Sequence, residues 1–234
     1  MGKMAEPEDI YEYVRQYLND KKDLLNRKIL VTAGPTLESI DPVRFISNYS
    51  SGKMGFEIAK AAYERGAEVT LISGPVNLTA SSKIKRIDVQ STQEMFNAVK
   101  NNMTGKNLIV MAAAVSDFKP KNITGKKIKT LNEFKLEFSY TTDILQYLGK
   151  NKKRFKLIGF ALETENEIAN AKKKLKSKNA DMIVLNNPNV EGAGFGTDTN
   201  KVTLIDNNNV TELPLMTKHD VADSILDYYV KNLS

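Results

Sequence analysis

Short apolar runs alternate with segments of helical periodicity along most of this chain. The apolar runs Lys28–Ala33, Glu68–Ile72 and Asn107–Ala114 have the length and composition of buried strands. Between them, Met54–Arg65 and Ser91–Asn102 repeat apolar residues with the roughly 3.6-residue period of a helix. Strands and helices that alternate in this way build a parallel sheet with crossover helices. The alternation therefore predicts an α/β fold: a Rossmann-like parallel sheet with helices on both faces.

The second half of the chain continues this alternation. Apolar runs at Lys156–Ala161 and Asp181–Leu185 predict two further strands, and helices are predicted over Thr142–Lys150, Asn166–Lys178 and Thr217–Val230. Two more short runs, Val202–Ile205 and Val210–Leu213, flank consecutive asparagines and predict a small antiparallel hairpin. Because a strand at the edge of a sheet offers unpaired backbone groups, we expect this hairpin region to serve dimerisation.

Residues 1–27 differ in composition from the rest of the chain. Pro7 lies near their start, acidic residues follow it and lysines crowd their end, which suits a helix and its dipole. We expect a linker or appendage over 1–27 and one folded domain over 28–234. No apolar run approaches the roughly 20 residues of a membrane span, and the N-terminus lacks a signal-peptide pattern. These features predict a cytoplasmic protein with no membrane partner.

The charge of the chain narrows the class of ligand. Lys and Arg number 34 against 28 Asp and Glu, a net charge of +6, which favours a nucleic acid or a phosphorylated small molecule. The lysines cluster at 119–135 and 150–178, although such runs are also typical of a solvated helix face. The chain contains no cysteine, which excludes disulfides, a thiolate nucleophile and cysteine-ligated metal centres.

A polar segment that contains glycine, Ser47–Gly55, leads into the helix predicted from Met54. Free backbone N–H groups at a helix N-terminus, beside small residues that admit a ligand, form an anion-binding site. We expect Gly52 and Gly55 to let a phosphate approach the backbone, because a side chain there would hold the phosphate away. The same residues are equally typical of a helix cap, so this segment alone leaves both interpretations open.

Two established nucleotide motifs do not match this segment. A Walker A loop requires Ser or Thr after its Gly-Lys pair, but Gly52-Lys53 is followed by Met54. A dinucleotide fingerprint needs glycines directly after the first strand, whereas about seventeen residues separate Gly34 from Gly52. An NAD(P)-dependent Rossmann-type reductase is therefore a weak alternative. A basic nucleic-acid-binding module is another, although it would need aromatic residues among the lysines, and the lysine runs have few.

Several further blocks of sequence occur in a fixed order over about residues 28–230. They are Thr32–Thr36, Ile40–Asn48, Ser50–Gly55, Met111–Asp117, Lys127–Lys129 and Gly159–Asn166. Together these blocks resemble the bacterial phosphopantothenoylcysteine synthetases. Residues 2–9 also resemble the junction after the flavin-dependent decarboxylase half of the bifunctional bacterial protein. The resemblance implies either the second half of such a protein or a free-standing synthetase, with FMN only in a fused decarboxylase half and not in this chain.

The resemblance also implies a reaction. A member of this family joins 4'-phosphopantothenate to L-cysteine in coenzyme A biosynthesis. The carboxylate attacks the α-phosphate of CTP to give an acyl-cytidylate and pyrophosphate, and the cysteine amine then displaces CMP. The bacterial resemblance implies CTP rather than ATP, Mg²⁺ on the triphosphate and a homodimer. It identifies no metal ligand in the sequence.

The family's catalytic residues correspond to Asn48 and Lys127. Asn48 would hold the acyl-nucleotide intermediate, and Lys127 would stabilise charge at the α-phosphate. Lys127 lies in the basic segment Lys119–Leu131, which contains Gly125 and which we expect to be a mobile loop that closes as a lid. The structural alternatives are an N-cap role for Asn48 and a solvated side chain for Lys127.

The resemblance carries over the remaining contacts residue by residue. Asp117 would accept from the ribose or the base, and Phe160 would pack on the cytosine unless it belongs to the core. Lys174 and Lys178 are one helical turn apart and would face the triphosphate. Thr141 and Thr142 stand where the family more often has Asn-Pro, which is a departure. The implied CTP contacts are Ser50, Ser51, Gly52, Met111, Ala112, Ala113, Asp117, Lys127, Thr141, Thr142, Asp143, Ile144, Phe160, Lys174 and Lys178; those to phosphopantothenate are Arg44, Asn48 and Ala113.

Overall fold

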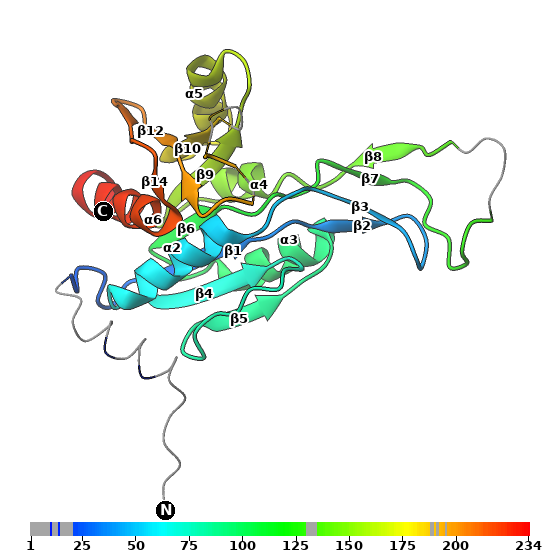
Figure 1. Ribbon diagram of the computed structural model, residues 1–234, viewed down its shortest axis with the longest axis horizontal. Helices are drawn as coiled ribbons and strands as arrows, with labels where there is room; N and C mark the ends of the chain where they lie inside the picture. Colours follow the sequence, from blue (N-terminus) through cyan, green and yellow to red (C-terminus); the bar gives the residue numbers. More distant parts are fainter. Residues whose placement is uncertain are drawn as a thin grey trace, which may run out of the picture.

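An eight-stranded sheet forms the centre of the computed structural model, with the strand order β13-β12-β10-β9-β6-β1-β4-β5 (Figure 1). The structure describes residues 10, 14, 21–129, 135–187, 190, 192–194 and 196–234. Six strands run parallel: β1 (Lys28–Ala33), β4 (Glu68–Ser73), β5 (Lys85–Asp88), β6 (Leu108–Met111), β9 (Lys156–Leu162) and β10 (Met182–Asn186). The antiparallel strands β12 (Val202–Ile205) and β13 (Val210–Glu212) complete one edge. This arrangement confirms the predicted Rossmann-like sheet and its hairpin.

Helices cover both faces of the sheet. One face carries α2 (Lys53–Glu64) and α6 (Lys218–Tyr228), whose buried residues join the core around Val31 and Val110. The other face carries α3 (Thr92–Asn102), α4 (Ile144–Lys150) and α5 (Glu167–Ser177), packed around Leu30 and Ile109. A single π-turn, η1 (Tyr229–Leu233), follows α6. Within the described part of the chain, no helix is both long and apolar enough to cross a bilayer.

Side-chain caps fix where three of these helices begin. Ser91 accepts a hydrogen bond from the backbone N–H of Glu94 at 3.2 Å, as the capping pattern predicts. Asp143 caps α4 through the N–H of Gln146 at 2.8 Å. Thr217 caps α6 by accepting from the N–H of Asp220 at 3.1 Å.

Two short antiparallel ribbons extend side by side away from the sheet (Figure 1). The first is β2 (Leu37–Ser39) with β3 (Phe45–Ser47), and the second is β7 (Phe118–Pro120) with β8 (Phe138–Tyr140). We call these two ribbons, with the turns that join their strands, the arms. Neither arm is among the elements predicted from the sequence. A third short pair joins β11 (Thr199–Asn200) to β14 (Met216–Thr217).

The structure corrects several predicted boundaries. The strand predicted over Asn107–Ala114 ends at Met111, because the chain then turns away and keeps only a single bridge from Ala114 to Pro35. The basic segment predicted as a loop from Lys119 begins inside β7 and leaves the described residues at 130. Most of the helix predicted over 1–27 lies outside the described residues, but 23–26 form turns instead, and Leu24 is fully buried in the core.

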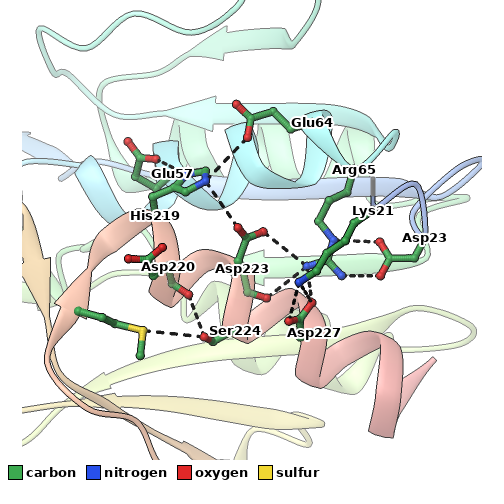
Figure 2. A network of polar contacts seen from close by, with 11 residues as sticks. Lys21, Asp23, Glu57, Glu64, Arg65, His219, Asp220, Asp223, Ser224 and Asp227 are labelled. Atoms are coloured by element: carbon green, nitrogen blue, oxygen red, sulfur yellow. Dashed lines mark hydrogen bonds and ion pairs between the residues drawn. The ribbon is translucent and has the colours of Figure 1, made fainter. Parts of the chain in front are cut away.

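An ion-pair network joins the C-terminal end of α2 to α6 (Figure 2). The fully buried guanidinium of Arg65 binds both carboxylate oxygens of Asp23, at 2.9 and 2.6 Å, and one oxygen of Asp227 at 2.8 Å. Nearby, the Nδ1 of His219 lies 3.0 Å from the Glu57 carboxylate. The only histidine of the chain therefore contributes to helix packing, and the network also holds the segment before β1 against the domain.

Candidate active site

Most of the predicted site residues lie near the carboxyl edge of the sheet. From β1 the chain proceeds to β4 and β5 on one side, and β6 then returns to the other side of β1. Adjacent strands whose connections leave in opposite directions open a crevice at their carboxyl ends, where ligands of open α/β sheets bind. The loop Ser50–Gly52 follows β3 and packs against Gly34 at the end of β1, and Met111–Asp117 covers the end of β6 and the residues after it, so both segments border this crevice.

The loop Ser50–Gly52 presents the N-terminus of α2 without a capping side chain. Gly52 is the N-cap residue, its φ is 79°, and no side chain among the described residues caps the helix. The hydroxyl of Ser50 accepts from the Gly52 N–H at 3.3 Å. Since Gly52 occupies the cap position, the N-cap role considered for Asn48 is wrong. An uncapped first turn supplies the backbone N–H donors that an anion requires.

The structure gives a different reason for Gly55 than the sequence analysis does. A Cβ at Gly55 would lie 2.6 Å from the Cβ of Ala33 and 2.9 Å from the carbonyl oxygen of Thr32. A Cβ at Gly52 would lie 3.0 Å from Val76, and its positive φ also favours glycine. Gly55 is therefore required by the close packing of α2 on β1, and the expectation that it makes room for a phosphate is wrong.

A buried hydroxyl network holds the ends of β1 and β6 together. Thr36 is fully buried, and its hydroxyl lies 3.0 Å from the hydroxyl of Thr92 and accepts from the Ser116 N–H at 2.9 Å. The hydroxyl of Thr141 donates to the Ser116 carbonyl at 2.5 Å, and its N–H donates to the Asp117 carbonyl at 3.0 Å. Asp117 and Thr141 are thus fixed beside each other through the Ser116 peptide.

Asn48 joins the same region from the other side. Its Nδ2 donates to the carbonyl oxygen of Ala114 at 2.9 Å, and the Thr36 N–H donates to that oxygen at 3.2 Å. The N–H of Ala113 donates to the Thr32 hydroxyl at 3.2 Å, which fixes the alanine-rich segment after β6 against β1. The sulfur of the buried Met111 accepts from the same hydroxyl at 3.7 Å.

Lysines from α5 approach this edge over the opposite face. The Lys178 ammonium donates to the Asp143 carboxylate at 2.5 Å, so α5 is tied to the first turn of α4. Burial lowers the pKa of Lys174, while the nearby carboxylates of Glu163, Asp117 and Asp143 oppose this effect and favour its charged form. No carboxylate among the described residues forms an ion pair with Lys174, so its ammonium is available to a ligand.

The other residues predicted to contact the nucleotide differ in how deeply they are buried. Ile144 is buried in the core, so its side chain is used in packing. Phe160 and Ala112 are partly buried and pack against the core on the α2 face, in keeping with the structural alternative considered for Phe160. Ser51 is partly buried, whereas Thr142 and Asp117 are exposed at the edge.

Arg44 and Lys127 lie on the arms rather than at the sheet edge. The Arg44 guanidinium binds Asp41 through Nε at 3.0 Å and Nη2 at 2.5 Å, and Nη2 also donates to the Ile128 carbonyl at 3.0 Å. Lys127, next to Ile128, is exposed. Among the described residues, no contact joins Arg44 or Lys127 to Lys174 or Asp117. The structure therefore divides the predicted site into a sheet-edge group and an arm group.

Sequence reasoning missed several residues that build this site. No role in the site was predicted for Thr36, Thr92 and Ser116, because a hydroxyl beside a strand end is the only signal that they offer. Asp41 has a clearer signal, because Asp followed by Pro42 is the pattern of a turn. Lys53 was also missed: its ammonium donates to Asp198 at 2.7 Å and to the Gly196 carbonyl at 3.0 Å, which holds the segment before β11 against α2.

Comparisons with known proteins show which family the chain resembles. A family model described as the DNA/pantothenate metabolism flavoprotein C-terminal domain matches residues 24–233. The coenzyme A biosynthesis bifunctional protein CoaBC of Bacillus subtilis (strain 168) is 43% identical over 96% of this chain and 57% of its own length. A cysteine/cysteine sulfinic acid decarboxylase of an unknown prokaryotic organism is 49% identical, over 96% of this chain and 65% of its own length.

A solved structure agrees with these relatives. The crystal structure of the C-terminal domain of CoaBC superposes with a TM-score of 0.78 at 41% identity, covering 89% of this chain and 96% of that one. The chain thus spans 57% of the length of the B. subtilis relative but nearly the whole of the separate C-terminal domain.

Proposed function

Because this chain belongs to the family of DNA/pantothenate metabolism flavoprotein C-terminal domains, we propose that it is a CTP-dependent phosphopantothenate–cysteine ligase of coenzyme A biosynthesis, acting in the cytoplasm. The observation that carries the proposal is the likeness to the C-terminal domain of CoaBC over nearly its full length. The decarboxylase name of the other relative describes a longer protein, of which about a third lies outside the match. It therefore supports the family rather than a decarboxylase activity of this chain.

The first step activates the acid. A carboxylate oxygen of 4'-phosphopantothenate attacks the α-phosphorus of CTP, and pyrophosphate leaves, which gives an acyl-cytidylate. Negative charge builds on the phosphoryl oxygens, and preorganised cations stabilise it. Lys174 is suited to this task, because it is partly buried, has carboxylates near it and has no ion-pair partner among the described residues. Lys127 would reach the α-phosphate once its arm closes over the edge or when a second chain contributes it.

The second step forms the amide. The cysteine amine attacks the acyl carbon, loses a proton and displaces CMP, which carries away one oxygen of the original carboxylate. Asn48 suits the developing oxyanion, since an amide Nδ2 has two N–H groups and only one is used on Ala114. Asp117, exposed beside Thr141, is placed to accept from a nucleotide hydroxyl or amino group.

Magnesium belongs to the substrate in this proposal. The described residues contain no group of three or more His, Cys, Asp or Glu arranged for a metal ion. We therefore propose that Mg²⁺ arrives on the CTP phosphates and that water completes its coordination. Chelation of Mg²⁺ should stop pyrophosphate release, and an unchanged rate would contradict this point.

A homodimer would complete the site, and the arms are the better candidate for its interface. Val43, Phe45, Phe118, Phe138 and Tyr140 expose 40% or more of their surface on the arms, with Tyr140 at 89%. The predicted edge strand β13 exposes Val210 at 42%. We propose that the arms pair with a second copy and bring Arg44 to its phosphopantothenate. Light scattering on a Phe45→Glu, Tyr140→Glu double variant should then show a monomer; a dimer would contradict this interface.

The bifunctional relatives support a fused decarboxylase half, with a free-standing synthetase as the alternative. We propose that FMN would belong to that half and not to this chain. The open reading frame that encodes this chain distinguishes the two: a decarboxylase coding region joined upstream supports fusion, and its absence supports a free-standing enzyme.

The proposed function is tested by pyrophosphate release with CTP or ATP and 4'-phosphopantothenate, with and without cysteine. We expect release with CTP and phosphopantothenate, and formation of phosphopantothenoylcysteine once cysteine is added. No release with either nucleotide would overturn the proposal. Salt-sensitive binding of an arbitrary oligonucleotide without CTP binding would favour the nucleic-acid alternative, and hydride transfer from NAD(P)H would favour the reductase.

A further inference from the structure

The side chains of Asp41 and Arg44 on one arm bind the backbone of Ile128 on the other arm, and we call these three residues the clasp. Its Oδ1 accepts from the N–H groups of Val43 at 2.8 Å and Arg44 at 2.9 Å. Its Oδ2 accepts from the Arg44 guanidinium and from the Ile128 N–H at 3.1 Å. The Asp41 side chain is fully buried, although it sits in a surface turn. A buried carboxylate with this many donors is held in one position.

The clasp binds both the N–H and the carbonyl group of Ile128. Asp41 accepts from the Ile128 N–H, and Nη2 of Arg44 donates to the Ile128 carbonyl at 3.0 Å. The Arg44 guanidinium and the backbone N–H groups hold the pKa of Asp41 well below its usual range, so the carboxylate stays charged at any pH at which a CTP-dependent enzyme works. Lys127 precedes this peptide directly, so the clasp fixes the backbone beside the proposed catalytic lysine.

One nitrogen of the Arg44 guanidinium, Nη1, is available to a ligand. A guanidinium has five N–H groups, and the contacts to Asp41 and Ile128 use those on Nε and Nη2. The two N–H groups of Nη1 have no acceptor among the described residues, and 46% of the side chain is exposed. A phosphate oxygen can therefore bind Nη1 without displacing Asp41 or Ile128. Phosphate is the expected partner, because the N–H groups of a guanidinium form strong charge-assisted hydrogen bonds to phosphate oxygens.

We propose that Asp41 and Arg44 couple the binding of phosphopantothenate to the placement of Lys127. The phosphate binds Nη1 of Arg44, and the same guanidinium then holds the Ile128 peptide and with it Lys127. Asp41 is a positioning residue in this scheme, because it acts through Arg44 and Ile128. The inference rests on the proposed function for its substrate, but the clasp itself can be measured without turnover.

The test compares Asp41→Asn and Arg44→Lys with the wild type by hydrogen exchange at the Ile128 amide, resolved by NMR. Without ligand, we expect the amide to exchange about tenfold faster in Asp41→Asn, the effect of one lost hydrogen bond. Adding 4'-phosphopantothenate should slow exchange in the wild type, and this slowing should vanish in Arg44→Lys, which keeps the charge but loses the planar fork. Glu137→Gln is the matched control, because Glu137 pairs with Lys121 on the same arm at 3.3 Å and does not contact Ile128.

Turnover supplies a second readout. In Asp41→Asn, pyrophosphate release at saturating substrate should fall at least about tenfold while KM for CTP stays within about twofold, because Lys127 is misplaced but the sheet edge is intact. Unchanged Ile128 exchange in Asp41→Asn, or no effect of phosphopantothenate on wild-type exchange, would overturn the inference. A wild type that binds phosphopantothenate and slows Ile128 exchange, yet releases no pyrophosphate, would instead overturn the proposed function and leave the clasp supported.

Discussion

The side-chain Nδ2 of Asn48 donates a hydrogen bond of 2.9 Å to the carbonyl oxygen of Ala114. This contact ties the loop before α2 to the chain that leaves β6. Since Thr36 donates its N–H to the same oxygen, the ends of β1, β3 and β6 converge there. The second N–H of the amide remains for a substrate carbonyl.

Asn48→Asp and Lys127→Gln should fail at different steps. Asn48→Asp removes the amide donor and places a negative charge beside the developing oxyanion, so amide formation should fall by roughly a hundredfold or more. Activation should continue, and the acyl-cytidylate should accumulate. Lys127→Gln removes the cation at the α-phosphate and should prevent the intermediate from forming. Mass spectrometry of quenched reactions measures the intermediate in each variant.

The control for these two variants is Lys172→Gln, because Lys172 is exposed on α5 and has no assigned contact with the nucleotide. It should retain near-normal rates for both steps. Equal and near-normal rates in Asn48→Asp and Lys127→Gln would contradict both assigned roles.

Gly55→Ala should lower both stability and nucleotide binding. The new Cβ would lie 2.6 Å from the Ala33 Cβ, and overpacking of this kind costs about 1–3 kcal/mol of unfolding free energy. Relief of the clash shifts α2 away from β1, so KM for CTP should rise. Urea unfolding and steady-state kinetics measure the two effects. Gly194→Ala is the control, because a Cβ there meets no described atom within 4 Å; a similar loss in both variants would contradict the packing argument.

The main strands are predictable because burial on both faces leaves continuous apolar runs. β1 (Lys28–Ala33) and β12 (Val202–Ile205) begin and end where the sequence predicts. The arms are not predictable in this way. β2 and β3 have three residues each and expose Phe45 at 56%, so no alternation of buried and exposed residues marks them. The arms are held in place by contacts between residues distant in sequence, such as the hydrogen bond between Asp41 and Ile128.

The part of the site at the sheet edge is predictable from the sequence, as the main strands are, whereas the part on the arms is not. A parallel sheet brings the ends of β1 and β6 together, so Gly52 and Asp117 follow from the strand pattern and the resemblance. The reason for Gly55 does not follow from them, because it depends on how closely α2 approaches Ala33 in three dimensions. The placement of Arg44 and Lys127 on the arms likewise depends on β2, β3, β7 and β8, which the sequence pattern does not reveal.

Arg65→Met should destabilise the fold without altering the site. The guanidinium is fully buried and donates to Asp23 and Asp227, and loss of a hydrogen bond to a charged group costs about 1.5–3 kcal/mol of unfolding free energy. Arg65 lies at the opposite end of α2 from Gly52, so KM for CTP should not change. Chemical unfolding measures the loss. In the exposed control pair of Lys28 and Glu68, 3.5 Å apart, Lys28→Gln should cost under about 1 kcal/mol; equal losses would contradict the burial argument.

The lowered pKa of Lys174 predicts that the protein takes up a proton when CTP binds. Burial lowers its pKa from the ordinary value, and the triphosphate stabilises the charged form and raises the pKa again. Affinity for CTP should therefore weaken as the pH rises through the lowered pKa of the free protein. Calorimetry over a series of pH values, in buffers of different ionisation enthalpy, measures the proton uptake. Lys174→Met should abolish the Lys174 contribution, and identical uptake in wild type and variant would contradict this assignment.

The fate of the carboxylate oxygens of phosphopantothenate tests the central claim most directly. Acid labelled with heavy oxygen in both carboxylate positions should transfer one labelled atom to CMP and keep the other in the amide product, as mass spectrometry would show. Unlabelled CMP, or heavy oxygen in inorganic phosphate with release of CDP, would contradict activation of the acid as an acyl-cytidylate.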